Sequence, residues 1–534
     1  RVIINELVCE GCGDCGVKSN CVSVQPLETE FGRKRAIDQS SCNKDFSCVN
    51  GFCPSFLTVH GATPRKAKPR DMQSADALPA PPEPRLPEIG PQPYSILVSG
   101  VGGTGVVTIS AILGMAAHLE HKGVGVIDMA GLAQKGGAVY CHVKIGRRPE
   151  DVNAIRVAAG EADLALGCDL VVAGTKKVLS AINKGETGVF VNTAEVYPGE
   201  ITRMADFSLP GERVKRAIQD ATGENYGFVD ASGAATALLG NSIGANMFML
   251  GFAGRRGFVP LSEASILKAI ELNGEAVAMN TTAFQWGRRA AADPKGFDAI
   301  VAPLRKPTEA RELSKSLDEI IERRVKFLTA YQDAAYAARY KLHVERAMAA
   351  ERAVVPGKTE FAEAVARYLF KLMAVKDEYE VARLYTDGAF RKQLDAAFEN
   401  VGRLEFHLAP PILGRKDAQG APVKTTFGPW MMTAYRLLAS LKFLRGGALD
   451  IFGKTAERRM ERKLIADYEA LLEELQAGLK PETHTLAVQI ASVPEKIRGF
   501  GHVKDSHLQK AKAEEGRLLA QFRDALNPVK VAAE

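Results

Sequence analysis

Short apolar runs that end in glycine or capping residues recur between residues 94 and 292. They are YSILVSG from Tyr94, GVGVID from Gly123, DLVVAG from Asp169 and GVFVNT from Gly188. Runs of this length are typical of strands that are buried on both faces, and the segments between them have helical character. The alternation predicts an α/β domain over residues 94–300 with a mostly parallel sheet covered on both sides.

Beyond residue 301 the apolar positions follow helical spacing. The spacing places Leu328, Tyr331, Ala335, Ala338 and Leu342 on one helix face, and Phe361, Val365, Leu369 and Leu372 on another. AERRMERKLIADYEALLEELQ predicts a further amphipathic helix. A loop-like stretch from Leu408 to Trp430 interrupts these helices. We therefore predict a mainly α-helical C-terminal domain over residues 301–534.

The first part of the chain follows neither pattern. Residues 1–62 hold seven of the nine cysteines, and residues 63–93 are rich in proline, which removes backbone donors and stiffens the chain. We expect a small cysteine-rich module followed by an extended linker. The other two cysteines, Cys141 and Cys168, lie in apolar, strand-like surroundings and are expected to be buried as small hydrophobic residues.

Composition excludes a few classes of protein. The 534 residues are 46% hydrophobic and 25% charged, and a net charge of +6 gives no case for nucleic acid binding. No apolar stretch is long enough to span a bilayer and no signal peptide is present, so we expect a cytoplasmic protein with no membrane partner. The chain begins with Arg1 rather than Met, and we expect it to continue a longer polypeptide.

Four cysteines fall within CEGCGDCGVKSNC. The odd number in the module and the expected cytoplasmic location argue against a disulfide framework. Cys9, Cys12 and Cys15 have the Cys-x2-Cys-x2-Cys spacing of an iron–sulfur cubane, whose fourth thiolate in two-cluster bacterial ferredoxins is a distant Cys followed by Pro. Cys53-Pro54 supplies that feature. We predict one [4Fe–4S] cluster on these four cysteines, in a ferredoxin-like module.

Cys21, Cys42 and Cys48 remain for a second cluster. In the two-cluster pattern a second Cys-x2-Cys-x2-Cys set supplies three ligands, but here its middle position is Asp45, a harder and weaker ligand for iron. We predict either a [4Fe–4S] cluster with Asp45 on one iron or a [3Fe–4S] cluster without that ligand. The first run also departs from the pattern, because five residues separate Cys15 from Cys21 and no Pro follows.

A glycine-rich turn follows the first predicted strand of the α/β domain. It has the form G-x-G-x-x-G and contains Gly100, Gly102, Gly103, Thr104 and Gly105. Asp128 ends the next predicted strand, which completes the outline of a dinucleotide fingerprint. Free N–H groups at a helix N-terminus favour a phosphate. The pattern leaves open NAD or flavin, another phosphate-bearing ligand, and a turn with no ligand.

A second polar and glycine-rich segment lies between apolar strands. It contains Gln134, Lys135, Gly136 and Gly137, and indicates a backbone bent close to a ligand or to a domain partner. His142 alternates within the strand that follows, where a single histidine is expected to be structural.

Together these motifs resemble the 2-oxoacid:ferredoxin oxidoreductase superfamily, and within it the large fused indolepyruvate ferredoxin oxidoreductases. CEGCGDCGVKSNC and SSCNKDFSCVNGFCPSF resemble the iron–sulfur segment that follows the thiamine domain there. GVGGTGVVTISAILGMAA, AQKGG and RGFVPLSEASILKAIELNGEAVAMNTTAFQWGRRAA resemble the gamma domain. LAPPILGRKD, FGPWMM and IRGFGHVKD resemble the helical C-terminal region, so the resemblance extends over essentially the whole chain.

The resemblance implies oxidative decarboxylation. A 2-oxoacid, such as an aryl pyruvate, adds to thiamine diphosphate and loses CO2; coenzyme A takes the acyl group, and electrons pass through iron–sulfur clusters to ferredoxin. This chain has no G-D-G…N motif for thiamine diphosphate and Mg²⁺, so the resemblance places both in upstream thiamine-binding domains and implies that the chain alone is inactive. It also implies a dimer of the complete enzyme. The glycine turn is then expected to contact the thiamine domains or the coenzyme A phosphates.

Two alternatives remain beside this interpretation. An NAD-linked or flavin-linked iron–sulfur reductase would bind its dinucleotide at the glycine turn. A non-catalytic scaffold would use the cysteines for structural zinc, although zinc sites usually have two Cys-x2-Cys pairs rather than a triple with a distant Cys-Pro.

Overall fold

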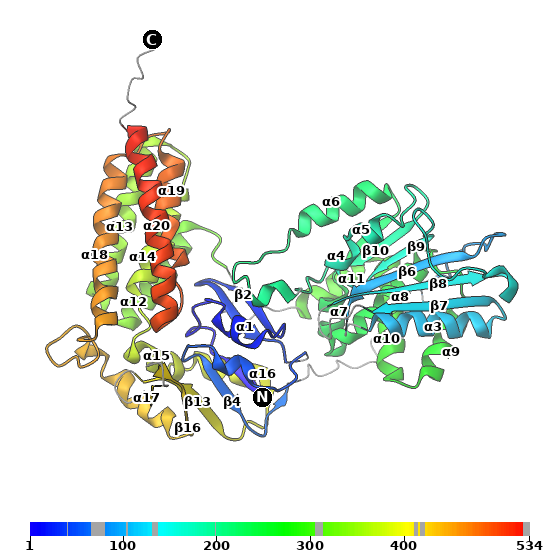
Figure 1. Cartoon of the computed structure of the whole chain (residues 1–534), viewed down its shortest axis with the longest axis horizontal. Coiled ribbons are helices and arrows are strands. Elements are labelled where there is room, and N and C mark those ends of the chain that lie inside the picture. The colour runs from blue at the N-terminus through cyan, green and yellow to red at the C-terminus, as the bar shows by residue number, and fades with distance from the viewer. Residues whose placement is uncertain are drawn as a thin grey trace, which may run out of the picture. The chain divides into compact units, whose positions relative to one another are not determined.

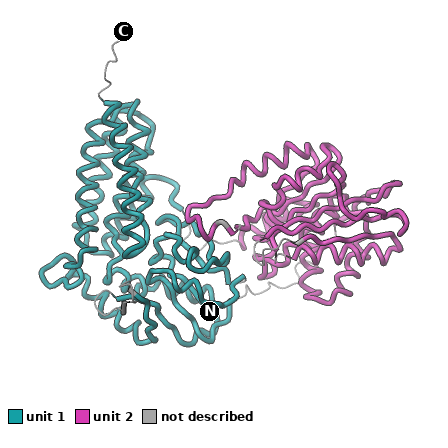
Figure 2. The backbone as a smooth tube through the Cα atoms, in the orientation of Figure 1, with its two compact units in different colours: residues 1–65, 307–534 teal, residues 66–306 magenta. Residues whose placement is uncertain are grey.

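The computed structural model describes residues 1–39, 41–65, 81–102, 105–130, 137–197, 199–304, 313–410, 415–416 and 422–526. The chain divides into two compact units (Figure 2). Unit 1 consists of residues 1–65 and 307–534, and unit 2 of residues 66–306. Unit 1 therefore joins the two ends of the sequence, whereas unit 2 is continuous.

Unit 2 is built on a six-stranded sheet with the order β11-β10-β9-β6-β8-β7 (Figure 1). Strands β6, β9, β10 and β11 pair in parallel, and β8 pairs antiparallel with both β6 and β7. The strands are β6 (Tyr94–Val101), β7 (Gly123–Ala130), β8 (Ala138–Gly146), β9 (Leu164–Gly167), β10 (Gly188–Asn192) and β11 (Tyr226–Val229). The predicted α/β domain with a mostly parallel sheet is confirmed.

Helices cover both faces of this sheet. Neighbouring residues of β6 alternate between two cores, because Ile96 belongs to the core on one face and Leu97 to the core on the other. The first core is formed with α3 (Val106–Leu119), α7 (Ala231–Leu239), α8 (Ala245–Arg255), α9 (Glu263–Asn273), α10 (Val277–Ala292) and α11 (Pro294–Val301). The second is formed with α4 (Leu170–Ala173), α5 (Lys176–Leu179) and α6 (Gly211–Thr222).

The expectation that DLVVAG forms a strand is wrong. The strand is the preceding LALG segment, β9, and residues 170–173 form the short helix α4. Asp169 is the reason, because its carboxylate accepts the backbone N–H of Val172 at 2.8 Å and caps the helix. An apolar run of this length suits either structure, and the capping residue in front of it decides.

Unit 1 contains a four-stranded antiparallel sheet to which both of its segments contribute. The order is β1 (Val2–Ile4), β4 (Phe56–Val59), β13 (Leu404–Leu408) and β16 (Thr425–Phe427). The two segments meet at the centre of the sheet, where Thr58 pairs with Glu405. Leu57, Tyr385 and Phe406 belong to the core beneath it. The cysteine-rich segment and the C-terminal region therefore share one sheet and one core.

The cysteine-rich segment adds only short elements of its own. They are α1 (Asp14–Ser19), the hairpin β2 (Val24–Thr29) and β3 (Gly32–Ile37), and the 3-10 turn η1 (Ser47–Asn50). The segment continues into β5 (Thr63–Pro64), which pairs with β12 (Phe398–Glu399). At the end of the hairpin, the buried Glu30 pairs with Arg324 of the C-terminal region.

The remainder of unit 1 is helical. The elements are α12 (Leu317–Tyr331), α13 (Ala334–Val354), α14 (Glu360–Met373), α15 (Glu378–Thr386), α16 (Ala389–Ala397), α17 (Met431–Ser440), α18 (Ala456–Ala477), α19 (His484–Ser492) and α20 (Gly501–Leu526). Helices α12–α14 and α18–α20 pack around a common core. The predicted mainly helical region is confirmed, as is the buried face of Phe361, Val365, Leu369 and Leu372.

The other predicted helix face is wrong. Leu328 and Tyr331 are buried at the end of α12, but Ala335, Ala338 and Leu342 are exposed. Asp333 begins a new helix, α13, by accepting the N–H of Tyr336 at 2.8 Å. The break resets the helical phase, so the buried positions of α13 are instead Ala337, Tyr340, Val344, Ala347 and Glu351.

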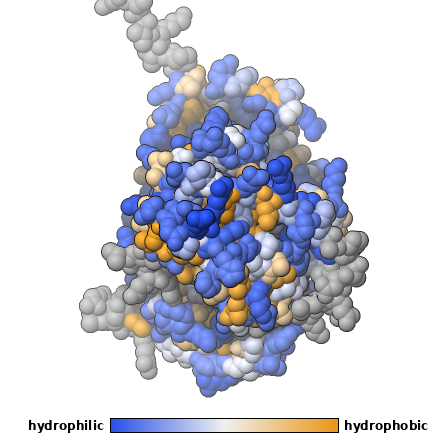
Figure 3. All heavy atoms as spheres, turned by 90° about the vertical axis from the view of Figure 1, so that its right-hand side faces the viewer, coloured by the Kyte–Doolittle hydropathy of each residue, from blue (hydrophilic) through white to orange (hydrophobic). Residues whose placement is uncertain are grey.

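No helix in the described part of the chain is long and apolar enough to cross a membrane. The face of the molecule in Figure 3 is mostly hydrophilic, and its hydrophobic side chains lie in small separate groups.

Candidate iron–sulfur site and glycine-rich turn

Four cysteines of unit 1 line one small cavity. They are Cys9 and Cys12 from the loop before α1, Cys15 from α1, and Cys53 from the segment between η1 and β4. Burial raises the pKa of the Cys9, Cys12 and Cys15 thiols, and the neighbouring Cys53 thiol raises each of them further. The four residues predicted to hold the first cluster are thus brought together, although Cys53 lies far from the others in sequence.

Glycines allow the loop to bend around this cavity. Gly11 and Gly13 have positive φ of 65° and 83°, a conformation that L side chains rarely adopt. A side chain at Gly11 would also lie 2.1 Å from the carbonyl oxygen of Arg33. The backbone N–H of Gly11 is left to donate to the Cys9 Sγ at 3.3 Å. Hydrogen bonds of this kind to ligand sulfurs are one means by which proteins adjust iron–sulfur clusters.

The other three cysteines of the module form a second group. Cys48 lies in η1, Cys21 follows α1 and Cys42 follows β3. Burial raises the pKa of the Cys48 thiol to about 12, and the thiols of Cys21 and Cys42 and the carboxylate of Asp45 add to the effect. Cys21, Cys42 and Asp45 therefore all act on the Cys48 thiol, and a shared cluster site for the four residues stays a prediction.

Asp45 is exposed and already engaged in a local turn. Its Oδ1 accepts the backbone N–H of Ser47 at 3.0 Å and the Ser47 hydroxyl at 2.9 Å. Its Oδ2 accepts the Asn43 side-chain amide at 3.2 Å. A ligand role for Asp45 would exchange some of these bonds for iron, and it stays a prediction.

Among the described residues, the thiols are not grouped as tightly as the ligands of a single zinc ion. All nine cysteines are free. Tetrahedral zinc with Zn–S bonds of about 2.3 Å needs sulfurs about 3.8 Å apart. Among the described residues, only Glu351, Glu360 and His484 bring three His, Cys, Asp or Glu ligand atoms within 4.8 Å of one another. No three cysteine thiols do so, whereas a cubane holds its thiolates on four separate irons and spreads them more widely.

The group of Glu351, Glu360 and His484 has a structural explanation. The Glu351 carboxylate accepts the N–H groups of Phe361 and Ala362 at 2.8 and 2.9 Å, at the start of α14. It also lies 2.7 Å from the Nε2 of His484. Glu351 thus caps one helix and pairs with a buried histidine.

In unit 2, the glycine-rich turn lies between β6 and α3, and its described residues make contacts within the protein. The buried Asp169 carboxylate accepts the N–H of Val101 at 2.7 Å, and Gly102 donates to the carbonyl oxygen of Gly137 at 2.7 Å. Gly105 has a φ of 83°, and a side chain there would lie 2.2 Å from the Asn246 amide nitrogen. Two N–H groups of the turn therefore donate within the protein. Gly103 and Thr104 lie outside the described residues.

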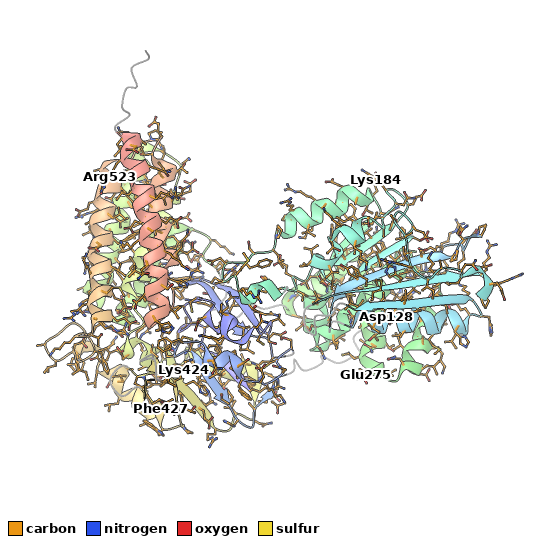
Figure 4. The ribbon with its side chains drawn as sticks, viewed as in Figure 1. Asp128, Lys184, Glu275, Lys424, Phe427 and Arg523 are labelled. Atoms are coloured by element: carbon orange, nitrogen blue, oxygen red, sulfur yellow. The ribbon has the colours of Figure 1, made fainter. Side chains whose placement is uncertain are left out.

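Asp128 does not take the position of a dinucleotide-binding acid. It lies on β7, and the antiparallel strand β8 separates β7 from β6, which carries the turn (Figures 1 and 4). Its carboxylate instead accepts the hydroxyl of Ser110, on α3, at 2.9 Å. In the dinucleotide fold the acid ends the strand adjacent to the turn.

The remaining predicted residues divide into two sets. One set, Gln134, Lys135 and Gly136, lies outside the described residues. Gly137 precedes β8, and its carbonyl oxygen accepts the N–H of Gly102. Cys141 and Cys168 are buried, as predicted. His142 is also buried, and its Nδ1 accepts the N–H of Val157 at 3.1 Å.

Comparison with known proteins places this chain in a family. Residues 95–290 match the model of the pyruvate ferredoxin/flavodoxin oxidoreductase family. The chain is 30% identical over 202 residues to the indolepyruvate oxidoreductase subunit IorB of Methanothermobacter thermautotrophicus, covering 38% of this chain and 98% of the relative. The IorB subunit of Pyrococcus horikoshii is 30% identical over 201 residues, covering 37% and 96%. The chain belongs to the 2-oxoacid:ferredoxin oxidoreductase superfamily.

Two further similarities complete the comparison. The pyruvate oxidoreductase subunit PORC of Thermotoga maritima is 22% identical, with 37% of this chain and 96% of that chain covered and a TM-score of 0.28. Residues 317–517 match a family of unknown function, DUF6537. That match lies wholly within unit 1, and it includes the strands that complete the sheet of the cysteine-rich segment.

Proposed function

We propose that this chain carries electrons within a 2-oxoacid:ferredoxin oxidoreductase whose substrate is an aryl pyruvate such as indolepyruvate. The observation that carries the proposal is the cavity lined by Cys9, Cys12, Cys15 and Cys53. Four thiols around one space, two of them on the buried residues Cys9 and Cys15, suit a [4Fe–4S] cluster, which supplies one-electron transfer when it is bound. The family match of unit 2 and the names of its relatives support the reaction class.

The two cysteine groups have different roles in this proposal. Cys9, Cys12, Cys15 and Cys53 would hold a [4Fe–4S] cluster inside unit 1. Cys21, Cys42, Cys48 and Asp45 would hold the second cluster, as [4Fe–4S] or [3Fe–4S], nearer the surface, because Asp45 is exposed. Two neighbouring clusters provide an internal and an outer station for electrons on their way to ferredoxin.

The remaining chemistry is assigned to partners. Thiamine diphosphate and Mg²⁺ would lie in thiamine-binding domains of the same enzyme, and coenzyme A would receive the acyl group. The gamma-type domain of unit 2 would contact those domains or the coenzyme A phosphates at the glycine turn and at the segment of residues 134–137. Neither alternative gains comparable support, since Asp128 is displaced from the turn and no three cysteine thiols lie within 4.8 Å of one another among the described residues.

Electron delivery tests the proposal. The chain, reconstituted with iron and sulfide under anaerobic conditions and reduced with dithionite, is freed of reductant and mixed with oxidised ferredoxin. We expect ferredoxin to be reduced by up to two electrons per chain, and the Cys48→Ala variant to deliver fewer. A reconstituted chain that holds its reducing equivalents in the presence of ferredoxin would refute an electron-transfer role.

A further inference from the structure

The region that matches a family of unknown function lies directly against the first cysteine group. The Tyr385 hydroxyl donates to the carbonyl oxygen of Pro54 at 2.7 Å. A side chain added at Gly499 would lie 3.4 Å from the Cβ of Cys12, so this loop passes close to a predicted ligand. The ring of His502 lies 4.8 Å from that of Phe52, next to Cys53.

The same region places cations next to the cysteine-rich segment. Lys376 pairs with Glu10, beside Cys9, at 2.7 Å. Burial alone would raise the pKa of Glu10, but the ammonium groups of Lys376, Lys34 and Lys371 hold it at about 2. Glu10 is therefore a carboxylate balanced by several cations. The polar surroundings of this cysteine group come largely from residues hundreds of positions away in sequence.

Lys424 differs from these cations because its contacts reach both groups: Val49 is next to Cys48, and Phe56 lines the cavity of the first group. It lies between β15 (Pro422–Val423) and β16 and is labelled in Figure 4. Its ammonium donates to the carbonyl oxygen of Val49, next to Cys48, at 3.0 Å. It also lies 5.2 Å from the centre of the Phe56 ring. These two contacts hold the side chain against the segment that links the two groups.

The electrostatic partners of Lys424 include residues of both groups. Burial lowers its pKa, and the groups that oppose the shift are the Cys53 and Cys15 thiols, the Asp14 carboxylate and the Cys48 thiol. Cys53 and Cys15 belong to the first cysteine group and Cys48 to the second. No salt bridge within 4 Å is found for Lys424 among the described residues, so its charge is directed at the cysteine-rich segment.

A partly buried positive charge beside a cluster stabilises the reduced form, because reduction adds an electron in surroundings of lower dielectric constant than water. We propose that residues 317–517 form the second half of the iron–sulfur module, and that the charge of Lys424, in this region, raises the reduction potential of both clusters. The inference rests on the proposed function and adds a role for the region of unknown function. A residue that only tied Val49 to β16 would leave both potentials unchanged.

The test compares three variants of the full-length chain. Lys424→Gln removes the charge, Lys424→Arg keeps it, and Lys392→Gln removes a charge from the exposed Lys392 on α16. Each is reconstituted with iron and sulfide and titrated potentiometrically by EPR. In Lys424→Gln we expect the ratio of reduced to oxidised cluster at a fixed potential to fall about tenfold for both signals. For a one-electron couple this equals about 59 mV. Lys424→Arg and Lys392→Gln should match the parent.

Each outcome decides the proposal. A shift in one signal only, no shift, or an equal shift in Lys424→Arg would overturn it. If Lys424→Gln takes up no iron while Lys424→Arg does, the positive charge at this position is required, as proposed. If neither variant takes up iron, the shape of the lysine side chain rather than its charge is required, and the proposal fails. A parent chain that binds no iron or sulfide would instead overturn the proposed function, so the two failures are distinguishable.

Discussion

The cysteine groups of unit 1 and the glycine turn of unit 2 are both recognisable sequence motifs, but their surroundings in the structure differ. Cys9, Cys12, Cys15 and Cys53 line one small cavity. At the glycine turn, the described N–H groups of Val101 and Gly102 already donate to Asp169 and Gly137, and the Asn246 amide lies against Gly105.

The two sites also differ in what builds them. The turn is assembled from strands and helices of one continuous segment, whereas the cysteine groups depend on residues from both ends of the chain. Destabilising substitutions in the C-terminal region should therefore affect the cysteine groups, whereas destabilising substitutions in unit 2 should not.

Removing a ligand thiol should have the largest effect. Cys53→Ala leaves a cubane without its fourth thiolate, so we expect loss of the first cluster and of about half of the iron bound by the parent. Iron and acid-labile sulfide assays after anaerobic reconstitution measure this. Cys168→Ala is the matched control, since Cys168 is a buried cysteine of unit 2, and it should retain all the iron. Equal iron content in both variants would show that Cys53 is not a cluster ligand.

Breaking the tie between the two segments of unit 1 should have the next largest effect. Arg324 is 2% exposed, pairs with the Glu30 carboxylate and donates to the Glu30 carbonyl oxygen at 2.9 Å. Arg324→Met removes the closest cation from the buried Glu30 carboxylate and leaves it the Ser314 N–H and Arg323 at 3.9 Å, which costs up to about 3–5 kcal/mol. Urea unfolding followed by the circular dichroism of the helices measures the loss.

Arg339 provides the control for this prediction. Its guanidinium pairs with Glu469, but its side chain is 46% exposed, so Arg339→Met should cost less than about 1 kcal/mol. Similar losses in the two variants would show that the buried pair does not hold the hairpin to the C-terminal region.

The titration of His142 should make the stability of unit 2 depend on pH. Burial, and then the nearby cations Lys177, Arg156 and Lys144, lower the pKa of His142 to about 4. Between pH 4 and the unfolded value near 6.5 only the unfolded state binds this proton, so stability falls as the pH falls, by about 3 kcal/mol in total. The fluorescence of Trp286, buried in unit 2, reports unfolding. His142→Gln should remove this part of the pH dependence, and an unchanged slope would exclude His142 as its source.

The smallest effect is expected at Asp128. Asp128→Asn keeps a hydrogen bond with Ser110 possible and removes an exposed charge, so it should change the free energy of unfolding by less than about 1 kcal/mol. Calorimetry should detect no NAD binding by either the parent or this variant. If the parent binds NAD and Asp128→Asn weakens that binding, the dinucleotide interpretation is correct. The contrast between the two units would then disappear.

Local sequence patterns predicted the helices and strands more successfully than they predicted which elements pack together. The sheet of unit 2 and the face of Phe361, Val365, Leu369 and Leu372 follow directly from apolar spacing. The exceptions, at DLVVAG and after Tyr331, arise where a single aspartate caps a helix and overrides the apolar pattern.

The grouping of Cys9, Cys12 and Cys15 with Cys53 was predictable because their spacing matches that of cluster ligands, and the structure brings them together at one cavity. Their neighbours were not, because Tyr385, Lys424 and Gly499 reach the site through tertiary pairing such as that of Thr58 with Glu405. No local signal in a single sequence marks those residues.

The most direct test of the central claim is the metal content of the chain itself. The protein is reconstituted anaerobically, assayed for iron and acid-labile sulfide, and examined by EPR before and after dithionite. Two occupied cysteine groups predict about seven or eight irons per chain, with matching sulfide and cluster signals. One or two zinc ions without sulfide would contradict the account and leave the cysteines as a structural zinc site.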